Sequence, residues 1–400
     1  MIHIPKKRCL TNLGRQTQIY NKQGSKIIFF KLFYEKVALF NLTKHKIDVK
    51  LVNMKLKTDK KYSLARVAAE LGTSKTAVSF VVNGLAREKG ISAALEQRIL
   101  DFCKATGFRP NIHAQRMNSQ YVENIGVLLD RDTALDEETP FSDYNASKVI
   151  GGIAAAADLA GYRFSVQLYS EGMDNKKVFE WFKNKEIDGL IYYGFEMPSD
   201  WRKTFQENDF KVVGVSIDPA FGIPCVNIDN YQASLNLTGH LIRKGHRKFI
   251  YIGGTPKSWP ALERYRGFRD ALQKENLEFS EEEDFYRADF VRDAAEQYIR
   301  ERWMHGRLDT DAIVCASDNM AVGVIRALTA AGCQVPEQVA VTGADNILLG
   351  QFITPPLTTF DYLPFEQGKA AFKLLHEHIT KPKSPANICL KTSLLVRQSG

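Results

Sequence analysis

The sequence predicts a small helical domain followed by a larger α/β body with parallel sheets. Two short amphipathic helices joined by a tight turn occupy residues 62–83. From Val122 onward, apolar strand-like segments alternate with helical ones, as in parallel α/β folds. The length of 400 residues is too great for one small domain, so two or three domains are expected.

The distribution of charge also separates the N-terminal region from the α/β body. Residues 1–53 carry a net charge of +9, residues 54–120 carry +7, and residues 121–400 carry −8. A basic N-terminal region joined to an acidic C-terminal body is typical of a nucleic-acid-binding protein with a separate soluble domain.

Composition and motifs exclude several classes of protein. No apolar run approaches the roughly 20 residues that a membrane helix needs, and the six cysteines stand far apart without C-x-x-C pairs. We therefore expect a soluble, cytoplasmic protein with reduced thiols and no membrane partner. The G-x-S-x-G, H-E-x-x-H, P-loop and G-x-G-x-x-G motifs are missing. We expect no enzymatic activity, no metal and no cofactor.

The helical domain begins with a helix-turn-helix pattern. Ser63 can cap a first helix and Gly72 can end it, and Ser74 can cap a second helix. The apolar positions that would face inward are Leu64, Val67, Ala68, Leu71, Ala77, Val78 and Val81. The positions left facing outward on the second helix are Lys75, Thr76, Ser79 and Phe80. This pattern alone also fits an ordinary helical hairpin of a larger bundle.

A third helix follows, capped by Ser92 and ended by Gly107. Its apolar stripe consists of Leu95, Ile99, Phe102 and Cys103. Pro110-Asn111 then starts a short segment that runs to Asn118, before the first strand of the body.

Many positions of this region, in order, resemble the DNA-binding headpiece of the LacI/GalR family of transcriptional regulators. The matching positions are Ser63-Leu64, Val67-Ala68, Gly72, Ser74, Val78-Ser79, Asn83-Gly84, Ile91-Ser92 and Phe108-Arg109-Pro110-Asn111. The resemblance implies that residues 111–118 form a hinge helix on operator DNA, with Met117 inserted between base pairs. The DNA-binding residues that it implies are Ser63, Ser74, Lys75, Thr76, Ser79, Phe80, Asn83, Asn111, Ala114 and Met117.

The N-terminal extension, residues 1–53, has little periodicity, and its apolar cluster from Ile27 lies among lysines. A secretory signal does not fit the position of this cluster, its interruption at Lys31 or the lack of a small-residue cleavage site. A basic DNA-contacting arm is one interpretation. Because the family's headpiece usually begins near the start of the chain, we prefer a start-site artefact, with a natural beginning at Met54 and a headpiece over 54–120.

The body from residue 121 has strands and helices in alternation. The predicted strands are residues 124–130, 163–169, 187–194, 210–217, 248–254, 311–317 and 339–345. This pattern resembles the type I periplasmic-binding-protein fold that the same family uses to sense effectors. The matching segments include Asn227-Ile228-Asp229-Asn230, Gly245-His246-Arg247-Lys248, Arg264 with Gly267-Phe268, Ala316-Ser317-Asp318, Thr342-Gly343-Ala344-Asp345 and Leu395-Val396-Arg397-Gln398-Ser399. We expect lobe 1 over about 121–227 and 354–382, and lobe 2 over about 228–353 and 383–400.

Candidate effector-binding residues follow from the rule that ligands of open parallel sheets bind beyond the carboxyl ends of the strands. Asp130, Ser216 and Asp345 each end a predicted strand. Arg264 occupies the position at which the family places a ligand-binding arginine. An arginine and carboxylates in one cleft can hold vicinal hydroxyls by charge-assisted hydrogen bonds, although surface pairing and helix capping are the ordinary alternatives.

Four further residues complete the predicted site. Trp259 or Phe290 can stack on an apolar ligand face, although either can simply fill core. Ser317 stands where the family usually carries asparagine, so the resemblance says little about ligand identity. Asp318 is as well suited to holding its loop as to contacting ligand.

Two classes of function fit these features. The first is a regulator, most simply a repressor, whose affinity for pseudo-palindromic double-stranded operator DNA is controlled by a sugar or sugar derivative. The second is a solute-binding protein that uses the same body for transport. The headpiece, the missing signal and the free cysteines favour the first. A homodimer is expected, because one helix-turn-helix covers half of a palindromic operator and no heptad segment follows the last motif.

Overall fold

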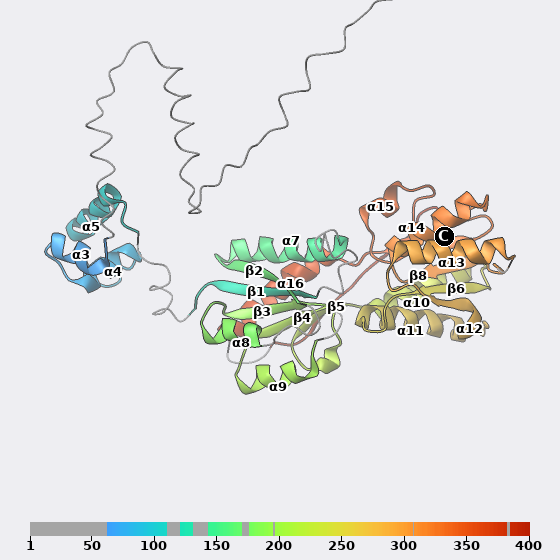
Figure 1. The fold of residues 1–400 in the computed structure, drawn as a ribbon, viewed down its shortest axis with the longest axis horizontal. Coiled ribbons are helices and arrows are strands. Elements are labelled where there is room, and N and C mark those ends of the chain that lie inside the picture. Colours follow the sequence, from blue (N-terminus) through green and yellow to red (C-terminus); the bar gives the residue numbers. More distant parts are fainter. Residues whose placement is uncertain are drawn as a thin grey trace, which may run out of the picture. The chain divides into compact units, whose positions relative to one another are not determined.

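The structure, a computed structural model, describes residues 62–109, 121–130, 143–169, 176–194, 197–306, 308–381 and 385–400. The chain divides at Pro110 into two compact units, and each unit is considered by itself (Figure 1). The predicted extension at 1–53 and the predicted hinge at 111–118 lie outside the described residues. Within the described parts, no helix has the length and apolar character needed to cross a membrane.

The headpiece consists of helices α3 (Leu64–Glu70), α4 (Lys75–Val82) and α5 (Ala93–Thr106). Ser63, Ser74 and Ser92 are the N-caps, as predicted. Their hydroxyl oxygens accept hydrogen bonds from the backbone amides of Arg66, Ala77 and Leu95 at 3.3, 3.0 and 3.4 Å. The small core is formed by Val67, Ala68, Val78, Val81, Ala86 and Ile99. The turn after α3 is possible because Gly72 adopts a φ of +60°, which favours glycine.

Lobe 1 of the body is a six-stranded parallel sheet of order β11-β5-β4-β3-β1-β2. Its strands are β1 (Asn124–Asp130), β2 (Arg163–Tyr169), β3 (Gly189–Tyr193), β4 (Val212–Val215), β5 (Cys225–Ile228) and β11 (Ile388–Leu390). Helices α7 (Tyr144–Leu159) and α16 (Pro364–Thr380) cover one face, and α8 (Lys176–Lys183) and α9 (Ser199–Glu207) cover the other. Successive strand side chains alternate between the two cores: Val127 and Leu129 join one, and Leu128 joins the other.

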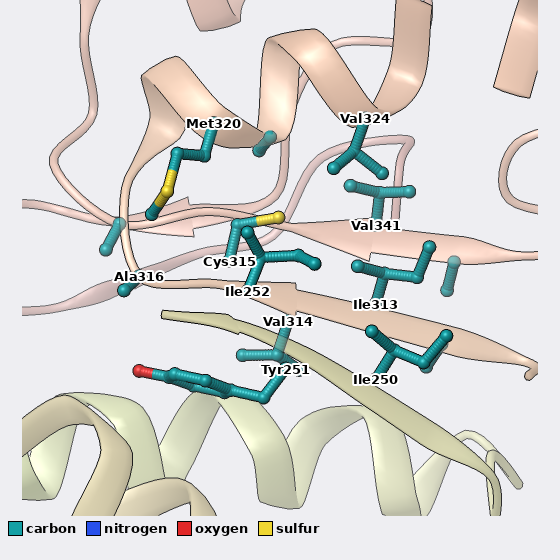
Figure 2. Close-up of a cluster of buried hydrophobic side chains, with 14 of the residues drawn as sticks. Ile250, Tyr251, Ile252, Ile313, Val314, Cys315, Ala316, Met320, Val324 and Val341 are labelled. Atoms are coloured by element: carbon teal, nitrogen blue, oxygen red, sulfur yellow. The ribbon is translucent and has the colours of Figure 1, made fainter. Parts of the chain in front are cut away.

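Lobe 2 is a four-stranded parallel sheet of order β7-β6-β8-β9. Its strands are β6 (Phe249–Gly253), β7 (Phe285–Arg287), β8 (Ala312–Cys315) and β9 (Ala340–Thr342). The paired helices are α10 (Asn230–Arg243) with α11 (Trp259–Lys274), and α13 (Arg292–Met304) with α14 (Asp318–Ala330). Figure 2 shows Met320 and Val324 of α14 over one face of this sheet, while Tyr251 points to the opposite face. Short helices α12 (Glu281–Asp284) and α15 (Leu348–Phe352) lie at its margins.

The chain crosses between the lobes in a way that corrects the predicted boundaries. Strands β10 (Thr359–Phe360) and β12 (Leu394–Leu395) pair with each other, and bridges from Thr358 and Asp361 place this segment beside β9 in lobe 2. Strand β11, in contrast, pairs with β5 in lobe 1. The predicted assignment of all of 354–382 to lobe 1 and all of 383–400 to lobe 2 is therefore wrong at these strands. Two or three residues are too few to show strand periodicity in a sequence.

Candidate functional site

The outer surface of α4 is the candidate DNA-contacting surface of the headpiece. Lys75 and Thr76 are exposed, and Ser79 and Phe80 are half-buried. The residues predicted to face inward on α4 are all buried, which fixes the rotation of the helix: Ala77, Val78 and Val81. Contacts with DNA by these outward residues stay predictions, and Asn111, Ala114 and Met117 lie outside the described residues.

A cavity of about 220 Å³ lies in the body, at the carboxyl ends of strands from both lobes. Lobe 1 supplies the beginning of α7 and the ends of β3 and β4, and lobe 2 supplies the beginnings of α11 and α14 and the loop after β9. Among the described residues, those that line the cavity are Asp143, Tyr144, Asn145, Tyr193, Gly194, Ser216, Ser258, Pro260, Arg264, Phe290, Ser317, Asn319, Asp345, Ile347 and Tyr362. This is the crevice that the strand-end rule predicts.

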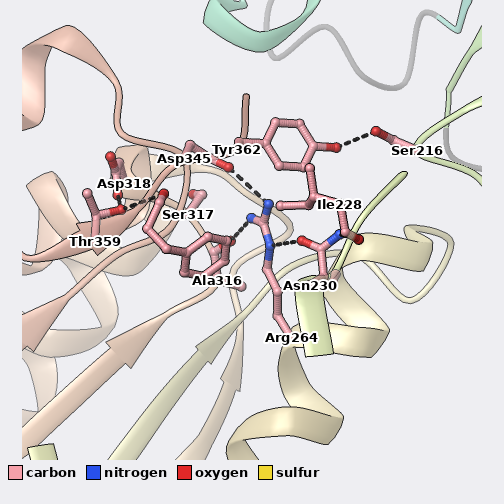
Figure 3. Close-up of polar contacts among 12 residues, drawn as sticks. Ser216, Ile228, Asn230, Arg264, Ala316, Ser317, Asp318, Asp345, Thr359 and Tyr362 are labelled. Atoms are coloured by element: carbon pink, nitrogen blue, oxygen red, sulfur yellow. Dashed lines mark hydrogen bonds and ion pairs between the residues drawn. The ribbon is translucent and has the colours of Figure 1, made fainter. Parts of the chain in front are cut away.

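Arg264 is the centre of the polar contacts around the cavity (Figure 3). It is only 3% exposed. Its Nε donates to Oδ1 of Asn230 at 2.8 Å and its Nη1 donates to the carbonyl oxygen of Ala316 at 2.6 Å. Its Nη2 lies 3.1 Å from Oδ1 of Asp345. These contacts fix the plane of the guanidinium, and the two hydrogen bonds use two of its five N–H groups.

Asp345 pairs with Arg264 at the cavity wall. Both side chains are almost fully buried, with side-chain exposures of 4% for Arg264 and 7% for Asp345. Burial raises the pKa of Asp345 to about 6, while the neighbouring guanidinium and a hydrogen bond from Asn145 act in the opposite direction. The Asp345 carboxylate and the Arg264 guanidinium form a buried ion pair at the cavity wall.

Asp318 was predicted to contact ligand or to hold its loop, and the structure shows the second arrangement. It is fully buried and does not line the cavity. Its Oδ1 accepts from the Thr359 hydroxyl at 2.6 Å and its Oδ2 accepts from the amide of Ile347 at 2.9 Å. Burial, followed by the charge of Asp345, raises the pKa of Asp318 to about 7.

Three hydrogen bonds among Tyr362, Ser216 and Gln367 form a closed network that connects the cavity to lobe 1. The Tyr362 hydroxyl donates to Oγ of Ser216 at 2.6 Å, and Ser216 donates to Oε1 of Gln367 at 3.0 Å. Gln367 returns a hydrogen bond from Nε2 to the carbonyl oxygen of Tyr362 at 2.6 Å. The ring of Tyr362 lies 4.9 Å from the guanidinium carbon of Arg264, within cation–π range. Tyr362 therefore contacts the central residues of both halves of the site.

The chemistry of this lining suits a small ligand with many hydroxyl groups. Charged groups and side-chain hydroxyls offer both donors and acceptors, and Tyr144, Tyr193, Phe290 and Tyr362 supply aromatic surface. Sugars need both kinds of contact, since their hydroxyls hydrogen-bond and their C–H faces pack on rings.

Comparisons with known proteins agree with this geometry. Residues 238–400 match a family described as periplasmic binding protein-like domain. The transcriptional regulator CelR of Thermobifida fusca is 27% identical over 345 residues, which cover 84% of this chain and 98% of the relative. The transcriptional repressor PurR of Mannheimia succiniciproducens is 28% identical over 337 residues, covering 83% and 97%.

Solved structures show the same fold. A CelR–cellobiose complex superposes with a TM-score of 0.63 at 25% identity, covering 85% of this chain and all of that chain. A Lac repressor dimer bound to operator and the anti-inducer ONPF gives 0.74 at 21% identity, covering 85% and 99%. The chain is similar to transcriptional regulators and repressors over more than 80% of its length, in agreement with the LacI/GalR resemblance. The resemblance seen in the sequence is confirmed.

Five of the eight predicted effector residues line the cavity: Ser216, Arg264, Phe290, Ser317 and Asp345. Asp130, Trp259 and Asp318 do not. Asp130 ends β1 but accepts a hydrogen bond from the Tyr192 hydroxyl at 3.2 Å beside the cavity wall. Trp259 begins α11 and is half-buried, whereas its neighbours Ser258 and Pro260 contact the cavity.

Several residues that line the cavity were missed by sequence reasoning. They include Asp143, Tyr144, Asn145, Tyr193, Asn319 and Tyr362. One available signal was the beginning of the helix after β1, because helix N-termini also point to the carboxyl edge of a parallel sheet. No comparable signal marked Tyr362, which stands in the crossover between lobes.

Proposed function

We propose that the protein is a sequence-specific DNA-binding regulator, most simply a repressor, whose operator affinity is controlled by a sugar bound between the two lobes. The observation that carries this proposal is the combination on one chain of a helix-turn-helix headpiece and a polar cavity centred on the buried pair of Arg264 and Asp345. A ligand held by both lobes has a different affinity for different lobe arrangements, and that difference can shift DNA binding.

The size and chemistry of the cavity support a sugar. At about 220 Å³ it is smaller than the roughly 300–1,000 Å³ typical of drug-sized ligands. Arg264 lines the cavity together with carboxylate, amide and hydroxyl side chains that offer hydrogen-bond donors and acceptors. The relative CelR has been solved in complex with cellobiose, and a related sugar would use the same kinds of contact.

The transport alternative is less well supported. The headpiece has the capped helices of a DNA-binding module, and a solute-binding protein needs none. The matches to transcriptional regulators extend over more than 80% of this chain. We also propose that the protein has no catalytic activity, acts as a homodimer and works in the cytoplasm.

A fluorescence-anisotropy titration tests the proposal. Full-length protein is titrated against DNA from upstream of its own gene and against scrambled DNA, with and without a panel of neutral sugars. We expect preferential binding to the upstream DNA and at least one sugar that changes this affinity about tenfold or more, within the usual coupling range of 5–150-fold.

Matched variants locate the ligand. Tyr144→Ala removes a half-buried aromatic ring from the cavity wall and is expected to weaken the sugar response. Asp158→Ala alters an exposed residue near the end of the same helix and should keep it. Equal binding to upstream and scrambled DNA would contradict the proposed regulatory function. A sugar response that survives Tyr144→Ala unchanged would contradict the assignment of the sugar site to this cavity.

A further inference from the structure

We propose that the cavity accepts neutral, hydroxyl-rich ligands and excludes anionic metabolites such as sugar phosphates and sugar acids, with Asp143 and Asn145 as the residues that determine this choice. The inference rests on the proposed effector site and names the charge class of its ligand.

The first support is the way in which helix N-termini meet the cavity. Helices α7, α11 and α14 all begin at its wall. A helix N-terminus usually favours anions, because unpaired N–H groups and the helix dipole point outward there. A phosphate-binding cavity would leave such groups available.

In this cavity the protein's own side chains occupy these positions. Asp143 caps α7 and accepts from the amide of Ala146 at 2.6 Å. Ser258 caps α11 and Ser317 caps α14, each accepting a backbone N–H at 3.3 Å. Pro260, in the first turn of α11, has no N–H to offer. The donors that would attract an anion are therefore reduced, and at α7 a carboxylate stands in their place.

The second support is the balance of charged groups. Within the described lining, the charged side chains are the carboxylates of Asp143 and Asp345 and the guanidinium of Arg264. Arg264 is already paired with Asp345 at 3.1 Å. Asp143 is thus left without a cationic partner in this lining, and burial raises its pKa because the charged form is poorly solvated there. A second anion placed nearby would meet like-charge repulsion in a poorly solvated site.

The third support is an unpaired acceptor at Asn145. Its Oδ1 is buried and has no hydrogen-bond partner in the structure. The side chain of Asn145 also hydrogen-bonds Asp345, which lowers the pKa of that carboxyl. The unpaired oxygen belongs to a residue that lines the cavity. An O–H donor on the ligand would satisfy it, whereas a phosphate dianion or a carboxylate has no proton to donate there.

Isothermal titration calorimetry on the full-length protein tests the selectivity. The probes are glucose, galactose and cellobiose, together with glucose 6-phosphate, galactose 6-phosphate, glucuronate, galacturonate and inorganic phosphate. We expect at least one neutral sugar to bind and each of its anionic derivatives to bind about tenfold or more weakly. Tighter binding of an anionic derivative than of its neutral parent would overturn the inference.

Variants test the two residues separately. Asp143→Asn keeps a good N-cap but removes the charge, so its affinity for inorganic phosphate and the sugar phosphates should rise about tenfold. Asp158→Asn is the same exchange near the far end of α7 and should change nothing. Asn145→Leu removes the unpaired acceptor and should weaken the neutral sugar without improving the anions.

The outcomes separate this inference from the proposed function. If no neutral sugar binds, the proposed sugar response fails, and the inorganic-phosphate arm still decides the charge selectivity. Phosphate that stays unbound by the native protein but binds Asp143→Asn supports the inference. Phosphate that binds the native protein, or an Asp143→Asn protein that folds but gains no affinity for it, refutes the inference.

Discussion

Replacing Gly152 by alanine tests how closely helices α7 and α16 must approach. A β-carbon at Gly152 would lie 2.0 Å from the carbonyl oxygen of Phe365, a backbone atom that cannot rotate away. The contact is reciprocal, since a β-carbon at Gly368 of α16 would lie 2.0 Å from the carbonyl oxygen of Val149. Atoms at this separation overlap, so either substitution must push the two helices apart.

Gly151 provides a matched control on the same helix. A β-carbon there would come no closer than 3.8 Å, to the ring of Phe365, which is an ordinary contact. Both glycines lie in the interior of α7, so both alanine variants gain about 1 kcal/mol of helix propensity. That gain cancels in the comparison. The remaining difference in stability between the two variants is the overpacking cost at Gly152, about 1–3 kcal/mol. We expect the upper end of this range, because backbone atoms must move.

Urea and thermal unfolding of the two variants measure this difference. At about 2–4 °C per kcal/mol for a domain of this size class, Gly152→Ala should melt roughly 2–12 °C below Gly151→Ala. Gly151→Ala should equal or exceed the native protein. Equal melting temperatures for the two variants would refute the reasoning, since α7 and α16 would then separate at no cost.

Four further outcomes are expected. Arg264→Ala should lower the free energy of unfolding by about 3–5 kcal/mol, because it leaves Asp345 buried without its cation; chemical denaturation checks this, and Asp345→Asn in the same chain should recover part of the loss. Folding raises the pKa of Asp318 from 3.8 to about 7. Protonated Asp318 therefore contributes stability below about pH 4, and this contribution is lost as the pH rises to 7. Over that range the melting temperature of Asp318→Asn should fall less than that of the native protein. Phe80→Arg should shift the preferred base toward guanine by about 1–3 kcal/mol in selection from randomised DNA, and an unchanged consensus would show that residue 80 does not reach the bases. Met117→Lys should weaken binding to specific DNA much more than to non-specific DNA, and equal losses would exclude a wedge role.

The parts of the fold that were predictable from sequence are those in which a local rule is sufficient. The N-caps Ser63, Ser74 and Ser92 were predictable, because a serine directly before an apolar periodic segment typically accepts a hydrogen bond from the first helical turn. The long strands of both lobes were visible as buried apolar runs. Short strands such as β7 and β10 were not, because they are held by tertiary contacts, and two or three residues carry no readable period.

The site shows where the same limit applies to function. The strand-end rule located Ser216 and Asp345 because a residue that follows a strand of a parallel sheet is carried to one edge. The rule gives a position along the strand but not the direction of the side chain, and Asp130 therefore satisfies it while contacting Tyr192 outside the cavity lining.

Asp143 and Asn145 illustrate a different limit, because their importance depends on partners far away in sequence. In the sequence, Asp143 is an ordinary N-cap and Asn145 an ordinary polar residue of the first helical turn. Only the folded body brings Asn145 within hydrogen-bonding reach of Asp345, two hundred positions along the chain, and leaves its carbonyl oxygen buried without a donor. Ligand selectivity in such a site is a property of unsatisfied groups. Which groups are unsatisfied can be decided only after every nearby donor and acceptor has been placed.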